Sequence, residues 1–177
     1  PPALSLPVTS GPTLESSWLI ASGSFYNVNN QVSGNRVTPS IAVLNVNVSD
    51  GVVSAPLNST ASAEASLVLR YVDARNMVYV RLWKNTISVF KVVNNRVTHL
   101  GSVYVGTNSG KVSVTAIGSN YAIRFNDGPP ILTLADGTFT NGKVGVRLGK
   151  GASIVLADFT ADTATSSFAN LPYIASG

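Results

Sequence analysis

A chain of 177 residues without cysteine fits one domain, and it excludes disulfide frameworks, thiolate metal sites and cysteine catalysis. Hydrophobic residues make up 45% of the chain, yet no apolar run approaches the roughly 20 residues of a spanning helix, so we expect no membrane insertion. The net charge of +4 comes from 12 basic residues spread singly along the chain, so we expect no nucleic-acid partner, which would need a concentrated basic patch.

The two ends of the chain differ in composition from its middle. Residues 1–14 are rich in Pro, Ser, Thr and Gly, lack the basic start and apolar middle of a signal peptide, and are predicted to form a linker. Residues 163–177 are again small and polar, and they are predicted to form a C-terminal extension or a second linker. One domain is predicted over residues 15–162, and both ends are expected to continue into other modules.

The middle of the chain is a series of short apolar-polar alternations separated by Gly, Asn and Asp turns, which is the pattern of antiparallel strands. About a dozen strands at intervals of roughly 8 to 12 residues predict an all-β sandwich of two sheets. Pro129 and Pro130 cannot lie in a central strand, so they should open a short edge strand. The predicted strands are Trp18–Ile20, Phe25–Val28, Ile41–Val48, Val52–Leu57, Ala65–Val72, Met77–Trp83, Thr86–Val93, Arg96–Val105, Lys111–Ile117, Tyr121–Asn126, Ile131–Leu134, Lys143–Leu148 and Ser153–Thr160.

Alternation within these strands predicts the core, because successive side chains of a strand point to opposite faces. In the strand Met77–Trp83 the apolar face holds Val78, Val80 and Leu82, and in the preceding strand we expect Tyr71 on the face of its apolar neighbours. The residues predicted to be largely buried are Trp18, Phe25, Leu69, Val80, Leu82, Phe125, Val146 and Phe159.

The order of these segments resembles the concanavalin A-like, or laminin G-like, jelly rolls. The residues that carry the resemblance are Leu67–Leu82, Ile87–Gly101, Val112–Asn126, and Gly142–Leu148 with Ala157–Phe159. Within that superfamily the chain is most similar to modules in minor tail and receptor-binding proteins of actinobacterial phages, and less closely to carbohydrate-binding modules of secreted bacterial enzymes. The resemblance implies a two-sheet antiparallel jelly-roll sandwich.

A candidate ligand-binding face follows from the pairing of two strands. If the strands around residues 65–72 and 77–83 pair through the turn at 73–76, one sheet face gathers Arg70, Tyr79, Arg81 and Trp83. The resemblance makes this the concave face that jelly-roll lectins use. Aromatic rings can stack there on the apolar faces of sugars, and guanidinium groups can hold hydroxyls or carboxylates. The alternative is that Tyr79 and Trp83 cover a sheet face beneath a loop while the arginines shield the edges.

Other candidate groups point to no catalytic chemistry. His99, the only histidine, lies in an ordinary strand pattern without a nucleophile motif such as Gly-x-Ser-x-Gly. The eight carboxylates form no close same-face pair such as Glu-x-Asp-x-Glu, which the resemblance would require of a retaining glucanase. We therefore expect no enzyme, no cofactor and no metal ligands. The Asp-Gly turns at Asp50, Asp127 and Asp136 are assigned to turn formation, with a structural calcium ion as the alternative.

The resemblance implies a virion-surface module, in a tail tip or minor tail protein, that attaches a phage to its host through an envelope glycan. Other virion proteins are then expected as partners, the location is extracellular, and homo-oligomer formation within a particle is left open. Two alternatives from other classes also stay open. One is a carbohydrate-binding module of a secreted bacterial hydrolase, and the other is a purely structural decoration domain of a virion.

Overall fold

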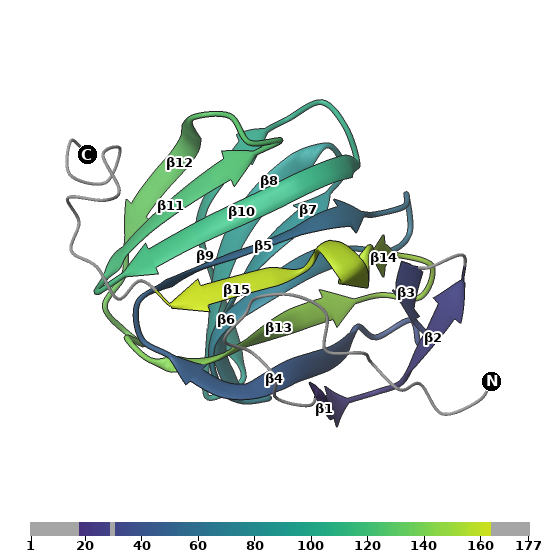
Figure 1. Cartoon of the computed structure of the whole chain (residues 1–177), viewed down its shortest axis with the longest axis horizontal. Helices are drawn as coiled ribbons and strands as arrows, with labels where there is room; N and C mark the ends of the chain where they lie inside the picture. Colours follow the sequence, from purple (N-terminus) through teal and green to yellow (C-terminus); the bar gives the residue numbers. More distant parts are fainter. Residues whose placement is uncertain (1–17, 29–30, 164–177) are drawn as a thin grey trace.

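The computed structural model describes residues 18–28 and 31–163, which form an all-β sandwich (Figure 1). Most of the predicted terminal segments, 1–14 and 163–177, therefore lie outside the described residues, except that Thr163 ends the last strand. The elements are β1 (Trp18–Ser22), β2 (Phe25–Val28), β3 (Gln31–Gly34), β4 (Ser40–Val48), β5 (Gly51–Asn58), β6 (Ala65–Asp73), β7 (Asn76–Trp83), β8 (Thr86–Val93), β9 (Arg96–Tyr104), β10 (Ser109–Ile117), β11 (Asn120–Phe125), β12 (Pro130–Ala135), β13 (Gly142–Leu148), β14 (Ser153–Ile154), the 3-10 turn η1 (Leu156–Asp158) and β15 (Thr160–Thr163).

The strands form two antiparallel sheets, which confirms the predicted sandwich. The seven-stranded sheet has the order β1-β4-β13-β6-β7-β8-β9, and the eight-stranded sheet has the order β12-β11-β10-β5-β14-β3-β2, with β15 also paired to β5. In Figure 1, β5, β10 and β11 of the second sheet lie in front of β7, β8 and β9 of the first. Within residues 18–28 and 31–163 no helix is long and apolar enough to cross a membrane.

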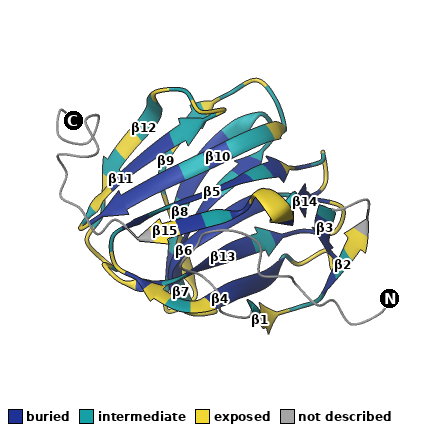
Figure 2. Ribbon diagram, viewed as in Figure 1, coloured by how far each residue is buried: buried dark blue, intermediate teal, exposed yellow. Residues whose placement is uncertain are grey.

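The main core lies between the two sheets, as strand alternation requires. Leu67 and Leu69 of β6, Val80 and Leu82 of β7 and the apolar residues of β10 pack together there with almost no exposure. Figure 2 shows buried residues along the central strands and exposed ones toward β12. The predicted burial is confirmed for Phe25, Leu69, Val80, Leu82, Val146 and Phe159, whereas Trp18 and Phe125 are only half-buried at its margin.

Two strand predictions need correction. First, β3 is absent from the predicted strands. Its four residues, which include Ser33 and Gly34, show too little alternation to be recognised from the sequence. The predicted strand over residues 153–160 is instead β14, η1 and β15, because the 3-10 turn places Leu156 and Phe159, three residues apart, into the same core. The prediction for Pro130 is confirmed, since it opens β12 at the edge of its sheet.

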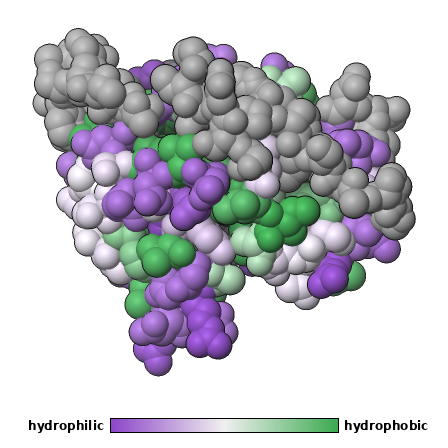
Figure 3. Space-filling model, turned by 60° about the horizontal axis from the view of Figure 1, so that its bottom comes forward, coloured by the Kyte–Doolittle hydropathy of each residue, from purple (hydrophilic) through white to green (hydrophobic). Residues whose placement is uncertain are grey.

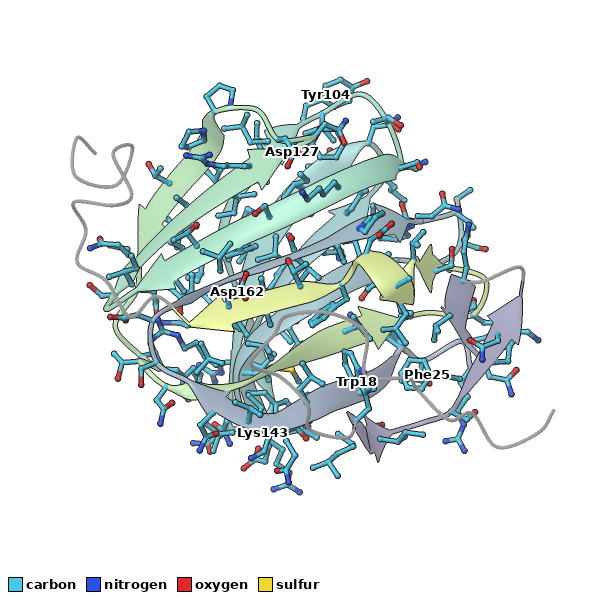
Figure 4. All side chains as sticks on the ribbon, in the orientation of Figure 1. Trp18, Phe25, Tyr104, Asp127, Lys143 and Asp162 are labelled. Atoms are coloured by element: carbon cyan, nitrogen blue, oxygen red, sulfur yellow. The ribbon has the colours of Figure 1, made fainter. Side chains whose placement is uncertain are left out.

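Few large apolar side chains are exposed at the surface of the sandwich. Figure 3 shows one face, on which hydrophobic residues lie scattered among hydrophilic ones. Tyr104, at the end of β9, is the most exposed aromatic residue described, and Figure 4 shows it at the rim of the molecule. The exposed large apolar residues are Leu19, Ile20, Val37, Val72, Val97 and Tyr104.

An ion pair joins the two sheets at the segment that follows β12. The carboxylate of Asp136 accepts hydrogen bonds from Nζ of Lys91 on β8 at 2.8 Å and from the backbone N–H of Thr138 at 3.0 Å. Burial alone would raise the pKa of Asp136, but these hydrogen bonds outweigh it and hold the pKa below its ordinary value of 3.8. The negative form of Asp136 is therefore favoured by folding.

This lowered pKa predicts a loss of stability in acid. A carboxyl group whose pKa is depressed in the folded state contributes its full stability above 3.8 and loses it as the pH falls through the folded value. Urea unfolding at pH 5 and at pH 3 should therefore show a smaller decrease in stability for Asp136→Asn than for the wild type. Equal decreases in stability in the two proteins would contradict the lowered pKa of Asp136. The matched control is Asp127→Asn, which removes a carboxylate from an exposed turn.

Candidate functional site

Two rows of paired residues cross the outer face of the seven-stranded sheet, the face that points away from the main core. The residues of both rows alternate along their strands with core residues such as Leu67, Val80 and Val146. In order from β4 to β9, the first row is Ile41, Arg147, Ser66, Arg81, Ser88 and Ser102, and the second row is Val43, Gly145, Val68, Tyr79, Phe90 and His99.

Two arginines of the first row meet one carboxylate. Nη1 of Arg81 on β7 lies 3.4 Å from Oε2 of Glu64, and Arg147 on β13 forms an ion pair with Oε1 of the same side chain. Burial lowers the pKa of Arg147 to about 10, and burial also lowers the pKa of Arg81 although nearby Tyr79 opposes this. Both arginines are cations at neutral pH, so two positive charges face one negative charge.

Aromatic rings form the floor beneath these charges. The rings of Tyr79 and Phe90 stack with 5.1 Å between centroids, and His99 lies 5.3 Å from Phe90. The guanidinium group of Arg147 lies 4.3 Å from the ring centre of Tyr79, and that of Arg81 lies 4.6 Å from the ring centre of Phe90. These are distances at which a cation is attracted to the face of an aromatic ring.

Trp83 stands at the end of β7 beside the same cluster. Its indole N–H donates to the backbone carbonyl of Thr60 at 3.1 Å, and its ring lies 5.1 Å from the guanidinium of Arg81 and 4.4 Å from Nζ of Lys84. Thr60 belongs to the loop of residues 59–64 between β5 and β6, which also carries Glu64. We call Glu64, Tyr79, Arg81, Trp83, Phe90 and Arg147 the cationic-aromatic face.

The structure brings together three of the four predicted ligand-binding residues and separates the fourth. Tyr79, Arg81 and Trp83 share one face as predicted, but Tyr79 is almost fully buried beneath its neighbours while Arg81 and Trp83 are partly accessible. In the structural alternative Tyr79 and Trp83 cover a sheet face beneath a loop, and the indole of Trp83 does hydrogen-bond to the backbone of Thr60 in the loop of residues 59–64.

The prediction that Arg70 lies on this face is wrong. A β-bulge follows Leu69, and Arg70 has a φ of 52°, a left-handed conformation that turns its side chain away from the outer face. Its Nη1 donates to the carbonyl of Phe139 at 2.9 Å, and its guanidinium lies 5.6 Å from the core ring of Tyr121. Tyr71 takes the outer-face position instead, and the prediction that it shares a face with Leu69 is wrong for the same reason.

Three residues of the cationic-aromatic face were not predicted as site residues: Glu64, Phe90 and Arg147. Phe90 and Arg147 could be assigned to the outer face by alternation, since Val89, Val146 and Leu148 are core residues. Their meeting with Arg81 depends on the strand order, which places β13 beside β6. Glu64 had no such signal, because it comes from a loop.

The carboxylates of the Asp-Gly turns have partners within the fold. Asp50 accepts a hydrogen bond from the backbone N–H of Gly118 at 2.9 Å, and Asp127 pairs with Lys111 at 2.7 Å. In the part of the chain that the structure describes, no three His, Asp or Glu side chains come together as a metal site would require. Each carboxylate is thus held by another segment of the chain, since Gly118 lies between β10 and β11 and Lys111 lies on β10.

Comparison with solved structures identifies the fold. No family model and no curated protein matches the chain. The carbohydrate-binding module CBM66 from Bacillus subtilis is 17% identical, with a TM-score of 0.74 over 82% of this chain and 95% of that one. The fold is a concanavalin A-like jelly roll. A Bacillus subtilis protein with a galectin-like fold, described as of unknown function, matches at 13% identity over 90% of this chain and 94% of that one, with a TM-score of 0.67.

The same jelly roll also occurs among enzymes. A β-glucanase from Bacillus licheniformis is 11% identical, and the match has a TM-score of 0.59 over 90% of this chain and 96% of that one. Identities of 17%, 13% and 11% show a shared fold, which hosts both binding modules and hydrolases. The function of this chain must therefore be argued from the residues of its own cationic-aromatic face.

Proposed function

We propose that this chain is a carbohydrate-binding domain and that a glycan binds on the cationic-aromatic face. The observation that carries the proposal is the arrangement of two partly accessible arginines and a carboxylate over a floor of aromatic rings. The partly exposed ring of Trp83 can stack on the apolar face of a sugar, and the charged side chains hydrogen-bond strongly to hydroxyl groups at an otherwise apolar surface. Both kinds of contact lie within one face of one sheet.

The single carboxylate of the cationic-aromatic face, Glu64, favours binding over hydrolysis. Glycosidases generally use two carboxyl groups, which lie about 5 to 9.5 Å apart on either side of the bond to be cleaved. Among the described residues, Glu64 is the carboxylate that contacts Arg81 and Arg147, and it is held by both of them. Each of its two oxygens is engaged by an arginine, Oε2 by Arg81 and Oε1 by Arg147, so neither is free to donate a proton to a leaving group.

A glycan array followed by titration calorimetry tests the proposal. Phe90→Ala removes the ring that contacts Tyr79, Arg81 and His99, so it should weaken binding about tenfold, as the loss of a central aromatic contact does. The matched control is Thr133→Ala, exposed on β12 of the other sheet, which should bind as the wild type does. Absence of binding to every glycan, or equal affinity of Phe90→Ala and wild type, would contradict the proposal.

For the biological setting, the proposal is a module of a phage tail tip or minor tail protein that attaches the particle to a host envelope glycan. Its support is the resemblance of the segments Leu67–Leu82 and Ile87–Gly101 to such modules. Purified domain added to host cells should then compete with phage adsorption. If the domain binds a glycan but does not compete with phage adsorption, a module of a secreted hydrolase is favoured. If the domain is detected on phage particles but binds no glycan, a decoration domain is favoured.

A further inference from the structure

The cationic-aromatic face has an excess of positive charge that its own residues do not neutralise. Arg81 and Arg147 approach it from β7 and β13, and Glu64 is the carboxylate paired with both. Lys84 adds a further cation next to the ring of Trp83. Nε of Arg81 is buried and has no hydrogen-bond acceptor among the described residues.

This charge lies in surroundings that are poor in water. The side chains of Arg81 and Arg147 are only 23% and 20% exposed, and each guanidinium lies against an aromatic ring rather than in solvent. Removing a cation from water is unfavourable unless an opposite charge compensates it. Glu64 compensates one of the two arginines, and the remaining exposed fraction of both side chains is open to a ligand.

We infer that the glycan bound here carries an anionic group, a carboxylate or a phosphate, which binds the Arg81 and Arg147 pair while the sugar ring stacks nearby. This inference rests on the proposed function and narrows its ligand to acidic glycans. A guanidinium group suits this role because its planar donors match the oxygen atoms of a carboxylate or a phosphate.

Two matched pairs of glycans test the inference at physiological ionic strength. One pair is oligogalacturonate and its methyl ester, and the other is a phosphorylated mannan and the same mannan after dephosphorylation. We expect the acidic member of at least one pair to bind at least tenfold more tightly than its neutral partner. The pair that shows the preference distinguishes a carboxylate from a phosphate.

Variants assign the preference to the arginine pair. Arg147→Gln should remove the preference, whereas Arg36→Gln, an exposed position between β3 and β4 with the same change in net charge, should keep it. Glu64→Gln removes the competing carboxylate and leaves both arginines intact, so it should tighten binding of the acidic member at least threefold. Thermal unfolding of each variant checks that it is folded, and Arg81→Gln replaces Arg147→Gln if the latter does not fold.

The outcomes separate this inference from the proposed function. Three results would overturn the inference. The acidic and neutral glycans of both pairs could bind equally, the preference for the acidic glycan could survive in Arg147→Gln, or the preference could be lost equally in Arg36→Gln. Neutral glycans bound on the array, with neither acidic member preferred, would overturn it and leave the proposed function intact. Failure to bind any glycan would overturn both.

Discussion

Leu82→Ala should lower the free energy of unfolding by about 2 to 5 kcal/mol, the range measured for truncated leucines in protein cores. Leu82 is completely buried and lies between Ala65 of β6 and Ile87 of β8, which are equally buried. Truncation therefore removes apolar contacts on both sides and leaves a cavity that neighbouring strands cannot close. Urea unfolding measured by fluorescence or circular dichroism gives the difference directly.

Val97→Ala on β9 is the control for this measurement. Val97 is 54% exposed, and its truncation should change the free energy of unfolding by less than about 0.5 kcal/mol. A comparably small effect of Leu82→Ala would place Leu82 on the surface. The two faces of β7 would then be reversed, and Tyr79 and Arg81 would belong to the core rather than to a binding face.

Trp83→Ala should weaken glycan binding by about 1 to 3 kcal/mol, the loss typical of a contact residue at the centre of an interface. Its folding stability should fall less, by about 0.5 to 1.5 kcal/mol, because the half-buried indole makes one hydrogen bond, to the carbonyl of Thr60. Calorimetric titration with a glycan identified on the array and thermal unfolding measure the two effects separately.

Trp83→Phe separates the ring from its hydrogen bond. Phenylalanine keeps an aromatic surface beside Arg81 but cannot donate to Thr60, so this variant should retain most of the affinity and lose no more stability than Trp83→Ala. A loss of about 3 to 5 kcal/mol of stability in Trp83→Ala would be that of a core aromatic residue. Trp83 would then serve the fold, and the glycan proposal would depend on Phe90 and the arginines alone.

Local alternation was sufficient to predict most strands and to place Tyr79, Arg81 and Trp83 on the same face of β7. It could not predict the conformation of Arg70, because a single residue with positive φ reverses the faces of every residue after it until the strand ends. The sequence around Arg70 contains no glycine or asparagine to indicate such a position.

The charge pairs of the cationic-aromatic face depend on contacts between distant parts of the chain. Arg147 meets Glu64 and Tyr79 only because β13 lies next to β6, and that neighbour relation is a property of the jelly-roll topology. Glu64 itself lies where the chain passes from one sheet to the other, outside any periodic pattern. A list of alternating residues therefore places the aromatic rings and both arginines on the outer face, but it predicts neither the meeting of Arg81 with Arg147 nor the carboxylate that pairs with both.

The loop of residues 59–64 contacts both the aromatic and the charged residues of the cationic-aromatic face. It is closed by backbone hydrogen bonds between Thr60 and Ala63, it holds Trp83 through Thr60, and it supplies the only carboxylate that pairs with the two arginines among the described residues. Six residues at one crossover thus set both the position of an aromatic ring and the net charge of the face. Exchange of this loop between related domains is expected to change the charge of the cationic-aromatic face, while the strands beneath it keep Arg81, Trp83, Phe90 and Arg147 in place.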